Sequence, residues 1–283
     1  MFSNIEYTWL PSPAKLNLFL HICGRYDNGY HKLQSLFQLL DFGDEIGFRQ
    51  AVDSHIHLID NIPGLAPSDN LIVKAAEALL PYRTNQHGVD ICVKKNLPMG
   101  GGLGGGSSNA ATVLIALNAF WQCKLSVETL AEIGLSLGAD VPIFVHGHTA
   151  FAQGVGEVLS PCEQPHFYYL VATPDVHIST ADIFGHPNLP RNTPEIDFAE
   201  YKFEDTRNDC QKLVCDSHSK VASLLLWLLN YAPSRMTGTG ASVFAVFTQQ
   251  EQALKIKDKL PHGVSGFVAQ GVNHSSLHSL CSV

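Results

Sequence analysis

The chain has 283 residues, of which 45% are hydrophobic and 16% are charged, so it can bury the core of one large or two modest domains. Its formal net charge of −8 argues against a nucleic-acid binder, which needs a basic surface to neutralise phosphates. The N-terminus does not resemble a signal peptide, and no apolar stretch approaches the roughly 20 residues of a spanning helix. Seven scattered cysteines without a CxxC pair indicate reduced thiols, so we expect a cytoplasmic protein. From the charge and the lack of a long apolar stretch, we expect it to bind neither nucleic acid nor membrane.

The first half of the chain begins with strand patterns. Apolar and polar residues alternate over 14–22, which predicts a half-buried strand. Asp27-Asn28-Gly29 predicts a tight turn, and strand-like residues then continue over 33–48 with a second turn at Gly43-Asp44. A helix is expected after Asp69-Asn70, and another strand over 89–93.

The remainder mixes helices and strands. The sequence becomes helical from Ser108, and Ser126 is a suitable N-cap for a second helix that stops at the Gly138–Pro142 segment. Strands are expected within 143–172, a proline-rich loop over 186–194, a helix around 221–229 and a strand over 242–247. This order lacks the regular alternation of a doubly wound parallel sheet, so an α+β fold is favoured.

Six glycines within residues 100–106 form the most unusual feature of the sequence. Glycine loses the most entropy on folding, so we interpret this run at a strand–helix junction as a place where something approaches the backbone closely, rather than as a result of packing. The N-terminus of the following helix offers free N–H groups and a positive dipole end to an anion. The alternative is a flexible surface loop, although Ser107, Ser108 and the helix follow without linker character.

Two common nucleotide-binding loops do not fit this run. A Walker A loop ends in Gly-Lys-[Ser/Thr], whereas Gly105-Gly106-Ser107-Ser108 contains no lysine. A dinucleotide-binding loop needs a strand after its helix, with an acidic residue about 20 positions on, and a second helix is expected there instead.

The segment PMGGGLGGGSSN (98–109) resembles the phosphate loop of the GHMP kinase superfamily, which includes galactokinase, homoserine kinase and mevalonate kinase. PSPAKLNLFL (11–20) and TGTGASVFAV (237–246) match the same superfamily in the expected order. Together with DNGYH (27–31), LGADVP (137–142) and LPRNTP (189–194), these segments most resemble the kinases whose acceptor is 4-diphosphocytidyl-2-C-methyl-D-erythritol.

The resemblance implies catalytic roles for two residues. Asp140 would be the general base that deprotonates the acceptor hydroxyl, and Lys15 would hold Asp140 ionised and offset developing negative charge. Lys15 and Asn17 lie two apart on a strand and therefore share a face. Taken without the resemblance, Lys15 and Asn17 could sit on an exposed strand edge, and Asp140 could be a turn residue.

The resemblance also implies two binding regions. ATP would contact Asn70, Leu71, Lys95, Pro98, Met99, Gly100, Gly101, Gly102, Leu103, Gly104, Gly105, Gly106, Ser107, Ser108, Asn109, Gly238, Thr239 and Gly240. The acceptor would contact Asn17, Tyr30, His31, Phe37, Thr180 and Phe184, with the aromatic residues stacking on cytosine. Ordinary alternatives exist for several of these residues: core packing for Tyr30 and Phe184, a helix cap for Asn70 and a tight turn for 238–240.

The implied architecture is a two-domain GHMP kinase fold with its active site in the interdomain cleft. An N-terminal ATP-binding domain would span 1–155, and a C-terminal domain over 156–283 would contribute to substrate binding. Mg²⁺ would enter with ATP, and the expected partners are ATP and a cytidine diphosphate-linked polyol, bound by a monomer or homodimer. The histidine pairs 55/57 and 146/148 lack a third metal ligand nearby in sequence. Two alternatives stay open: a GHMP kinase for another alcohol such as homoserine, or a non-catalytic nucleotide-binding regulator.

Overall fold

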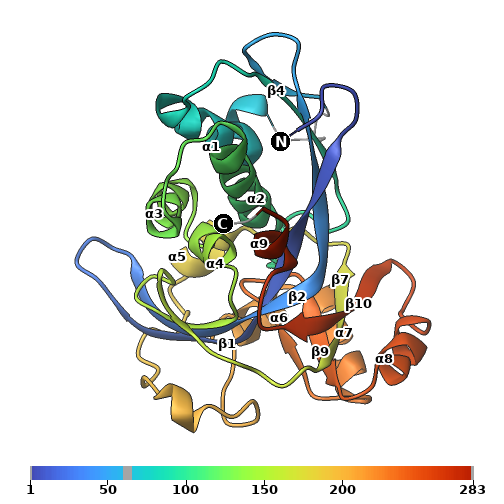
Figure 1. The fold of residues 1–283 in the computed structure, drawn as a ribbon. Coiled ribbons are helices and arrows are strands. Elements are labelled where there is room, and N and C mark those ends of the chain that lie inside the picture. Colours follow the sequence, from blue (N-terminus) through green and yellow to red (C-terminus); the bar gives the residue numbers. More distant parts are fainter. Residues whose placement is uncertain (1, 60–65, 282–283) are drawn as a thin grey trace.

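The computed structural model describes residues 2–59 and 66–281 and combines strands and helices in an α+β architecture (Figure 1). The main sheet has the strand order β3-β4-β2-β10-β7-β9-β8, and β1 and β5 also pair with β2. The strands are β1 (Thr8–Arg25), β2 (His31–Gln50), β3 (Ile56–Leu58), β4 (Val89–Lys94), β5 (Ala150–Gln153), β6 (Val158–Pro161), β7 (Tyr168–Pro174), β8 (Ser234–Met236), β9 (Val243–Phe247) and β10 (Val264–Val272). The helices are α1 (Leu71–Leu79), α2 (Gly105–Phe120), α3 (Val127–Leu137), α4 (Val141–His146), α5 (Thr180–Gly185), α6 (Gln211–Ser217), α7 (Ser219–Leu229), α8 (Gln250–Lys257) and α9 (Ser276–Cys281).

Strands β1 and β2 form one long antiparallel hairpin, paired from Thr8 opposite Phe48 to Arg25 opposite His31. The expected turn between them is confirmed, and Gly29 takes φ +88° there. The prediction that β1 is half-buried is wrong, because both of its faces are covered over most of its length and α2 and α9 lie against it. Its polar side chains therefore face the protein interior.

Strand β2 runs without a break through Gly43-Asp44, so the turn expected there is wrong. A Cβ on Gly43 would lie 2.0 Å from the carbonyl oxygen of Ser12, which shows that this glycine permits close approach of β1 rather than a change of direction. The uninterrupted strand pairs with β4 at one end and with β5 and β10 further along, so it connects the two halves of the chain.

Helices α1 to α4 surround the larger hydrophobic core, and α2 is buried along most of its length. The predicted caps are confirmed: Asn70 accepts a hydrogen bond from the backbone of Ile72, and Ser126 accepts one from Thr129. Helix α2 begins three residues before the expected start at Ser108. The strand expected from 143 is instead helix α4, because Pro142 occupies its first turn, where the missing N–H costs no hydrogen bond.

In the second half of the chain, α7 packs against β7, β8 and β9, and α6 packs against α7, around another core. The helix and strand expected around 221–229 and 242–247 are confirmed as α7 and β9. The chain then returns to the first half, where α9 lies beside α2 and buries Leu277 (Figure 1). The domain boundary at residue 155 stays a prediction. Across the described ranges, no helix is long and apolar enough to cross a membrane.

Candidate active site

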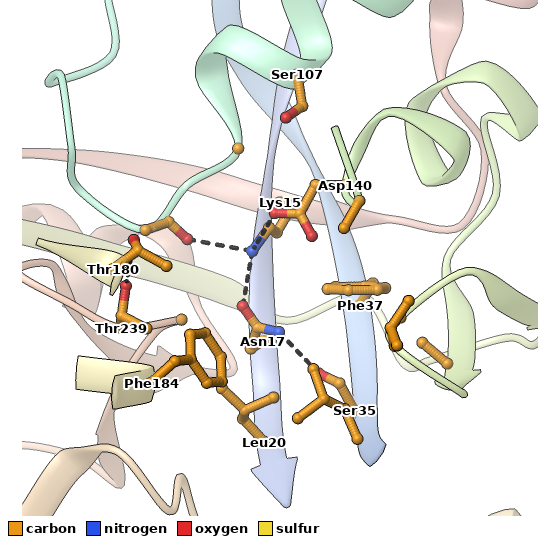
Figure 2. A pocket seen from close by; sticks show the side chains of 18 residues that line it. Lys15, Asn17, Leu20, Ser35, Phe37, Ser107, Asp140, Thr180, Phe184 and Thr239 are labelled. Atoms are coloured by element: carbon orange, nitrogen blue, oxygen red, sulfur yellow. Dashed lines mark hydrogen bonds and ion pairs between the residues drawn. The ribbon is translucent and has the colours of Figure 1, made fainter. Parts of the chain in front are cut away.

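Lys15 and Asp140 meet in a cavity of about 380 Å³ between the glycine-rich loop and the β1–β2 hairpin (Figure 2). The Lys15 ammonium lies 3.2 Å from Asp140 Oδ2 and donates to Asn17 Oδ1 at 2.7 Å and to the Gly102 carbonyl at 3.3 Å. The Lys15 side chain is 4% exposed, whereas that of Asp140 is 35% exposed. A buried cation thus holds a carboxylate that remains open to the cavity.

Local structure explains why these side chains converge. Lys15 and Asn17 occupy alternate positions of β1 and are both buried, which excludes the exposed strand edge considered above. The Asn17 amide donates to Ser35 Oγ at 2.8 Å, and the Asn17 backbone N–H donates to Thr237 Oγ1 at 2.9 Å. Asp140 directly precedes α4, which places its carboxylate beside the helix N-terminus.

The glycine-rich loop is shaped partly by the protein itself. Gly100, Gly102 and Gly104 have φ values of +68°, +75° and +72°, a backbone region that disfavours side chains. A Cβ on Gly102 would lie 2.5 Å from the Thr237 carbonyl oxygen, and one on Gly104 would lie 2.8 Å from the Phe144 ring. The interpretation that packing cannot explain the glycine run is therefore wrong for these two positions.

A second pocket adjoins the cavity and gathers most of the residues expected to contact ATP. Its lining comprises Asp69, Asn70, Leu71, Lys95, Asn109 and residues 98–107. Ser108 does not line it, because its buried hydroxyl accepts a hydrogen bond from Ser12 at 3.0 Å. Gly238 and Thr239 line the central cavity instead, and Gly240 lies behind them against Met236.

A third pocket lies at the hairpin turn and contains Tyr30, His31 and Phe184. The rings of His31 and Phe184 are 5.3 Å apart, and Tyr30 is 64% exposed. Phe37 is not part of this group: its buried ring lies 5.2 Å from the Lys15 ammonium in the central cavity. Thr180 also faces the central cavity, with its hydroxyl 3.0 Å from that of Thr239 (Figure 2).

The three pockets form one continuous groove. Gly102, Gly104 and Ser107 line both the glycine-loop pocket and the central cavity. Leu33, Ala139, Val155 and Phe184 line both the central cavity and the pocket at the hairpin turn. A ligand at the glycine loop and another at Tyr30 would therefore meet at Lys15 and Asp140.

Sequence reasoning missed two residues that hold this groove in place. Asp44 is buried, pairs with the Lys95 ammonium and accepts from the backbone of Asn96 and Leu97 at 2.8 and 2.9 Å, so it fixes the segment that enters the glycine loop. Arg191 donates to His31 Nε2 at 3.0 Å. Asp44 carries a turn signal in the sequence, and Arg191 lies within LPRNTP (189–194), where the resemblance assigns it no role.

Histidine pairs do not assemble into a metal site within the part of the chain that the structure describes, where no group of three or more His, Cys, Asp or Glu side chains is placed to hold a metal. His55 and His57 both contact Asp53 at the surface, and their hydrogen bonds lower the pKa of Asp53 to about 2. His148 Nδ1 lies 2.7 Å from His274 Nδ1 instead of facing His146.

A glycine loop at a helix N-terminus, a buried lysine and an accessible carboxylate along one groove are features of a small-molecule kinase. Residues 70–148 match the family of GHMP kinases N terminal domains, and residues 194–265 match the GHMP kinases C terminal family. The chain belongs to the GHMP kinase family.

Its relatives include enzymes with the expected acceptor. A 4-diphosphocytidyl-2-C-methyl-D-erythritol kinase of Pseudoalteromonas atlantica is 60% identical over 95% of this chain and 94% of the relative. The solved structure of a 4-(cytidine 5'-diphospho)-2C-methyl-D-erythritol kinase superposes with a TM-score of 0.82 at 28% identity, covering 94% of this chain and 100% of that chain. A homoserine kinase of Cytophaga hutchinsonii gives a TM-score of 0.65 at 16% identity, covering 97% of each chain, which shows the fold alone. The predicted α+β fold and GHMP kinase resemblance are confirmed.

Proposed function

We propose that this protein transfers the γ-phosphoryl group of ATP to the 2-hydroxyl of 4-diphosphocytidyl-2-C-methyl-D-erythritol, in the non-mevalonate route to isoprenoid precursors. The observation that carries the proposal is the continuous groove, in which an anion-binding loop and an aromatic pocket flank Lys15 and Asp140. The 60% identity to a kinase of that name supports the choice of acceptor.

At the donor end, the glycine loop would hold the phosphates of MgATP. Gly104 directly precedes α2, so the free N–H groups of the first turn and the helix dipole favour negative charge there. The Ser107 hydroxyl and the Asp140 carboxylate are oxygen groups on the shared cavity wall, and oxygen is the ligand type that Mg²⁺ prefers. Magnesium would enter as part of this substrate, with most of its ligands supplied by phosphate and water.

At the centre, Asp140 would accept the proton of the attacking hydroxyl. The hydroxyl oxygen would bond to the γ-phosphorus as the bond from that phosphorus to ADP breaks and ADP leaves. Lys15 would pair with the Asp140 carboxylate and counter negative charge on the transferred group. Asn17 would orient Lys15 through its side-chain oxygen. Positioning accounts for most of the expected rate enhancement, because phosphoryl transfer leaves the protein little covalent work.

At the acceptor end, Tyr30 and Phe184 would stack on the cytosine ring, a contact typically worth about 1–3 kcal/mol per base. The exposure of Tyr30 suits a side chain that a ligand covers.

Free thiols at Cys23, Cys123, Cys162, Cys210 and Cys215 support a reducing, cytoplasmic location.

An acceptor panel tests the proposal directly. The purified protein is incubated with MgATP and either 4-diphosphocytidyl-2-C-methyl-D-erythritol, homoserine or galactose, and the products are identified by ³¹P NMR and mass spectrometry. We expect a phosphomonoester only from the cytidine compound. Phosphorylation of homoserine alone would overturn the acceptor, and ATP binding without turnover of any alcohol would favour the regulator.

A further inference from the structure

Arg191 bridges two walls of the pocket at the hairpin turn. Its Nε–H donates to His31 Nε2 at 3.0 Å, while Nη2 donates to the carbonyl oxygens of Phe184 and His186 at 3.0 and 2.9 Å. We propose that Arg191 is the positioning residue of the base pocket: it selects the neutral Nδ1–H tautomer of His31 and holds Phe184 at ring-contact distance from it. This inference rests on the proposed function, since it assigns how the cytidine end of that acceptor is selected.

The imidazole of His31 faces a side chain that can only donate hydrogen bonds. A guanidinium has no acceptor and keeps its protons, so the nitrogen that it contacts must offer a lone pair. His31 Nε2 is that nitrogen, which leaves the ring proton of the neutral form on Nδ1. The histidine thus presents one defined donor instead of two interchangeable tautomers.

Arg191 also holds the backbone that carries Phe184. Helix α5 ends at Gly185, so the carbonyls of its last turn lack partners within the helix. Arg191 satisfies the carbonyls of Phe184, His186 and Leu189, the last at 3.0 Å from Nη1. A cation is also the favoured charge at a helix C-terminus. The same side chain therefore orders both the imidazole and the segment of the facing phenylalanine.

Charge around His31 agrees with this geometry. Burial lowers the pKa of His31, and the positive charges of Arg191 and then Arg25 lower it further. The Arg25 guanidinium donates to the Gly29 carbonyl at 2.9 Å, so it acts on His31 through its charge and not through a hydrogen bond. Loss of Arg191 should thus let His31 protonate at a higher pH, which would change the hydrogen-bonding character of the pocket.

A tautomer measurement tests the inference without relying on turnover. Long-range ¹H–¹⁵N spectra of the ¹⁵N-histidine-labelled full chain distinguish the two ring nitrogens, and the His31→Gln variant identifies the His31 signals among the 14 histidines. We expect the Nδ1–H form in the unmodified protein and a shift toward the Nε2–H form, with a higher pKa, in Arg191→Gln. An Nε2–H form in the unmodified protein, or no change in Arg191→Gln, would overturn the proposal.

Kinetics supply the second readout. In Arg191→Gln we expect the KM for the cytidine acceptor to rise about tenfold or more, since charge-assisted hydrogen bonds are lost, while the KM for ATP changes less than about threefold. Acceptor affinity should also fall as the pH drops from 7.5 to 6, more steeply than in the unmodified protein. Arg191→Lys keeps the charge but not the fork of donors, so it should recover the pH profile and only part of the affinity.

Arg207→Gln is the matched control. Arg207 donates to Thr193 Oγ1 at 2.9 Å, two residues after Arg191, and to Asp209 Oδ1 at 2.7 Å, and neither bond involves His31. Equal losses of acceptor affinity in Arg207→Gln and Arg191→Gln would reduce Arg191 to a general structural role and overturn the proposal. If the unmodified protein phosphorylated another alcohol, the proposed function would fail while the tautomer result still decided the role of Arg191.

Discussion

Lys15 is a buried side chain that nevertheless lines the central cavity. Its ammonium has three N–H donors and three acceptors: Asn17 Oδ1, the Gly102 carbonyl and Asp140 Oδ2. Two of these acceptors are fixed parts of β1 and the glycine loop. The third acceptor, the Asp140 carboxylate, is partly exposed, so an incoming phosphoryl group can approach the Lys15 ammonium beside it.

The first prediction concerns Asp140. In Asp140→Asn we expect kcat to fall about 10²–10⁴-fold, because the amide cannot accept the hydroxyl proton, while both KM values stay within about threefold. Steady-state kinetics with MgATP and the cytidine acceptor check this. Asp205→Asn, an exposed carboxylate 3.9 Å from Lys202, is the control and should keep full activity. A kcat of Asp140→Asn near that of the control would remove the base role.

The residues of the groove were predictable where the sequence places them on one strand or in one loop. Lys15 and Asn17 share a face by strand periodicity, and the glycine loop is dense enough to identify alone. Joining Asp140 to Lys15, or Arg191 to His31, requires contacts between residues more than 100 positions apart. Periodicity carries no information on such contacts, so the resemblance was needed for the first and the second was missed.

At the scale of elements, the glycine loop depends on the strand beside it. Asp44 lies in β2 with its side chain fully buried, and it meets the end of β4 through Lys95 and the next two backbone N–H groups. A buried carboxylate near a phosphate site is tolerable here because Lys95 neutralises it. Part of the effect of Lys95 on ATP binding would therefore come from its ion pair with Asp44, which holds the segment that enters the glycine loop.

The second prediction tests that support. Asp44→Asn can keep its oxygen on the backbone of Asn96 and Leu97, but its NH₂ then faces the Lys95 ammonium, donor against donor. We expect the free energy of unfolding to fall by about 2–3 kcal/mol and the KM for ATP to rise, as measured by urea denaturation and initial rates. Asp41 on the same strand is exposed and accepts one backbone N–H at 2.7 Å. The Asp41→Asn variant should therefore lose less than about 1 kcal/mol of unfolding free energy. Equal losses in the two variants would contradict this account.

The elements that sequence reasoning misassigned share one cause. Gly43-Asp44 and residues 143–146 carry signals that mean a turn or a strand locally, whereas packing decides their structure. Gly43 is required by the proximity of Ser12, and α4 follows from Pro142 at a helix start and an apolar run buried against α2 and α3. Caps were predicted correctly because a cap is a local hydrogen bond.

At the scale of the whole molecule, histidines should make stability depend on pH. Burial is the main factor that lowers the pKa values of His21, His148 and His278, while the unfolded chain keeps the ordinary value near 6.5. Below about pH 6.5 the unfolded state therefore binds more protons, so stability is lost as the pH falls toward the lowered folded-state values.

The third prediction follows from that linkage. Between pH 7 and 5 the free energy of unfolding should fall, with each such histidine contributing at most about 1.4 kcal/mol per pH unit. In His278→Gln the slope should be shallower, whereas exchange of the exposed His262 by Gln should leave it unchanged. Urea denaturation at several pH values checks this, and identical slopes in all three proteins would argue against a contribution from His278.

The last prediction concerns the return of the chain to its first half. Leu277 is 1% exposed and packs into the core of α1 to α4, so α9 joins residues from opposite ends of the sequence. Leu277→Ala should lower the free energy of unfolding by about 2–4 kcal/mol through lost burial and a cavity. Leu280 lies on the same helix but is 60% exposed, so Leu280→Ala should cost less than about 0.5 kcal/mol.

With Trp9 and Trp227 replaced by phenylalanine in every protein compared, fluorescence of Trp121 reports this transition, because its buried indole donates to the His87 carbonyl at 2.8 Å in the same core. A shift of the Trp121 transition to lower urea in Leu277→Ala, with no shift in Leu280→Ala, would show that α9 stabilises the half that carries the glycine loop. If neither variant moved the transition, α9 would contribute nothing to that half. The glycine loop opens α2, against which α9 packs, so destabilised Leu277→Ala protein should also lose ATP affinity as the urea concentration rises, before Leu280→Ala does.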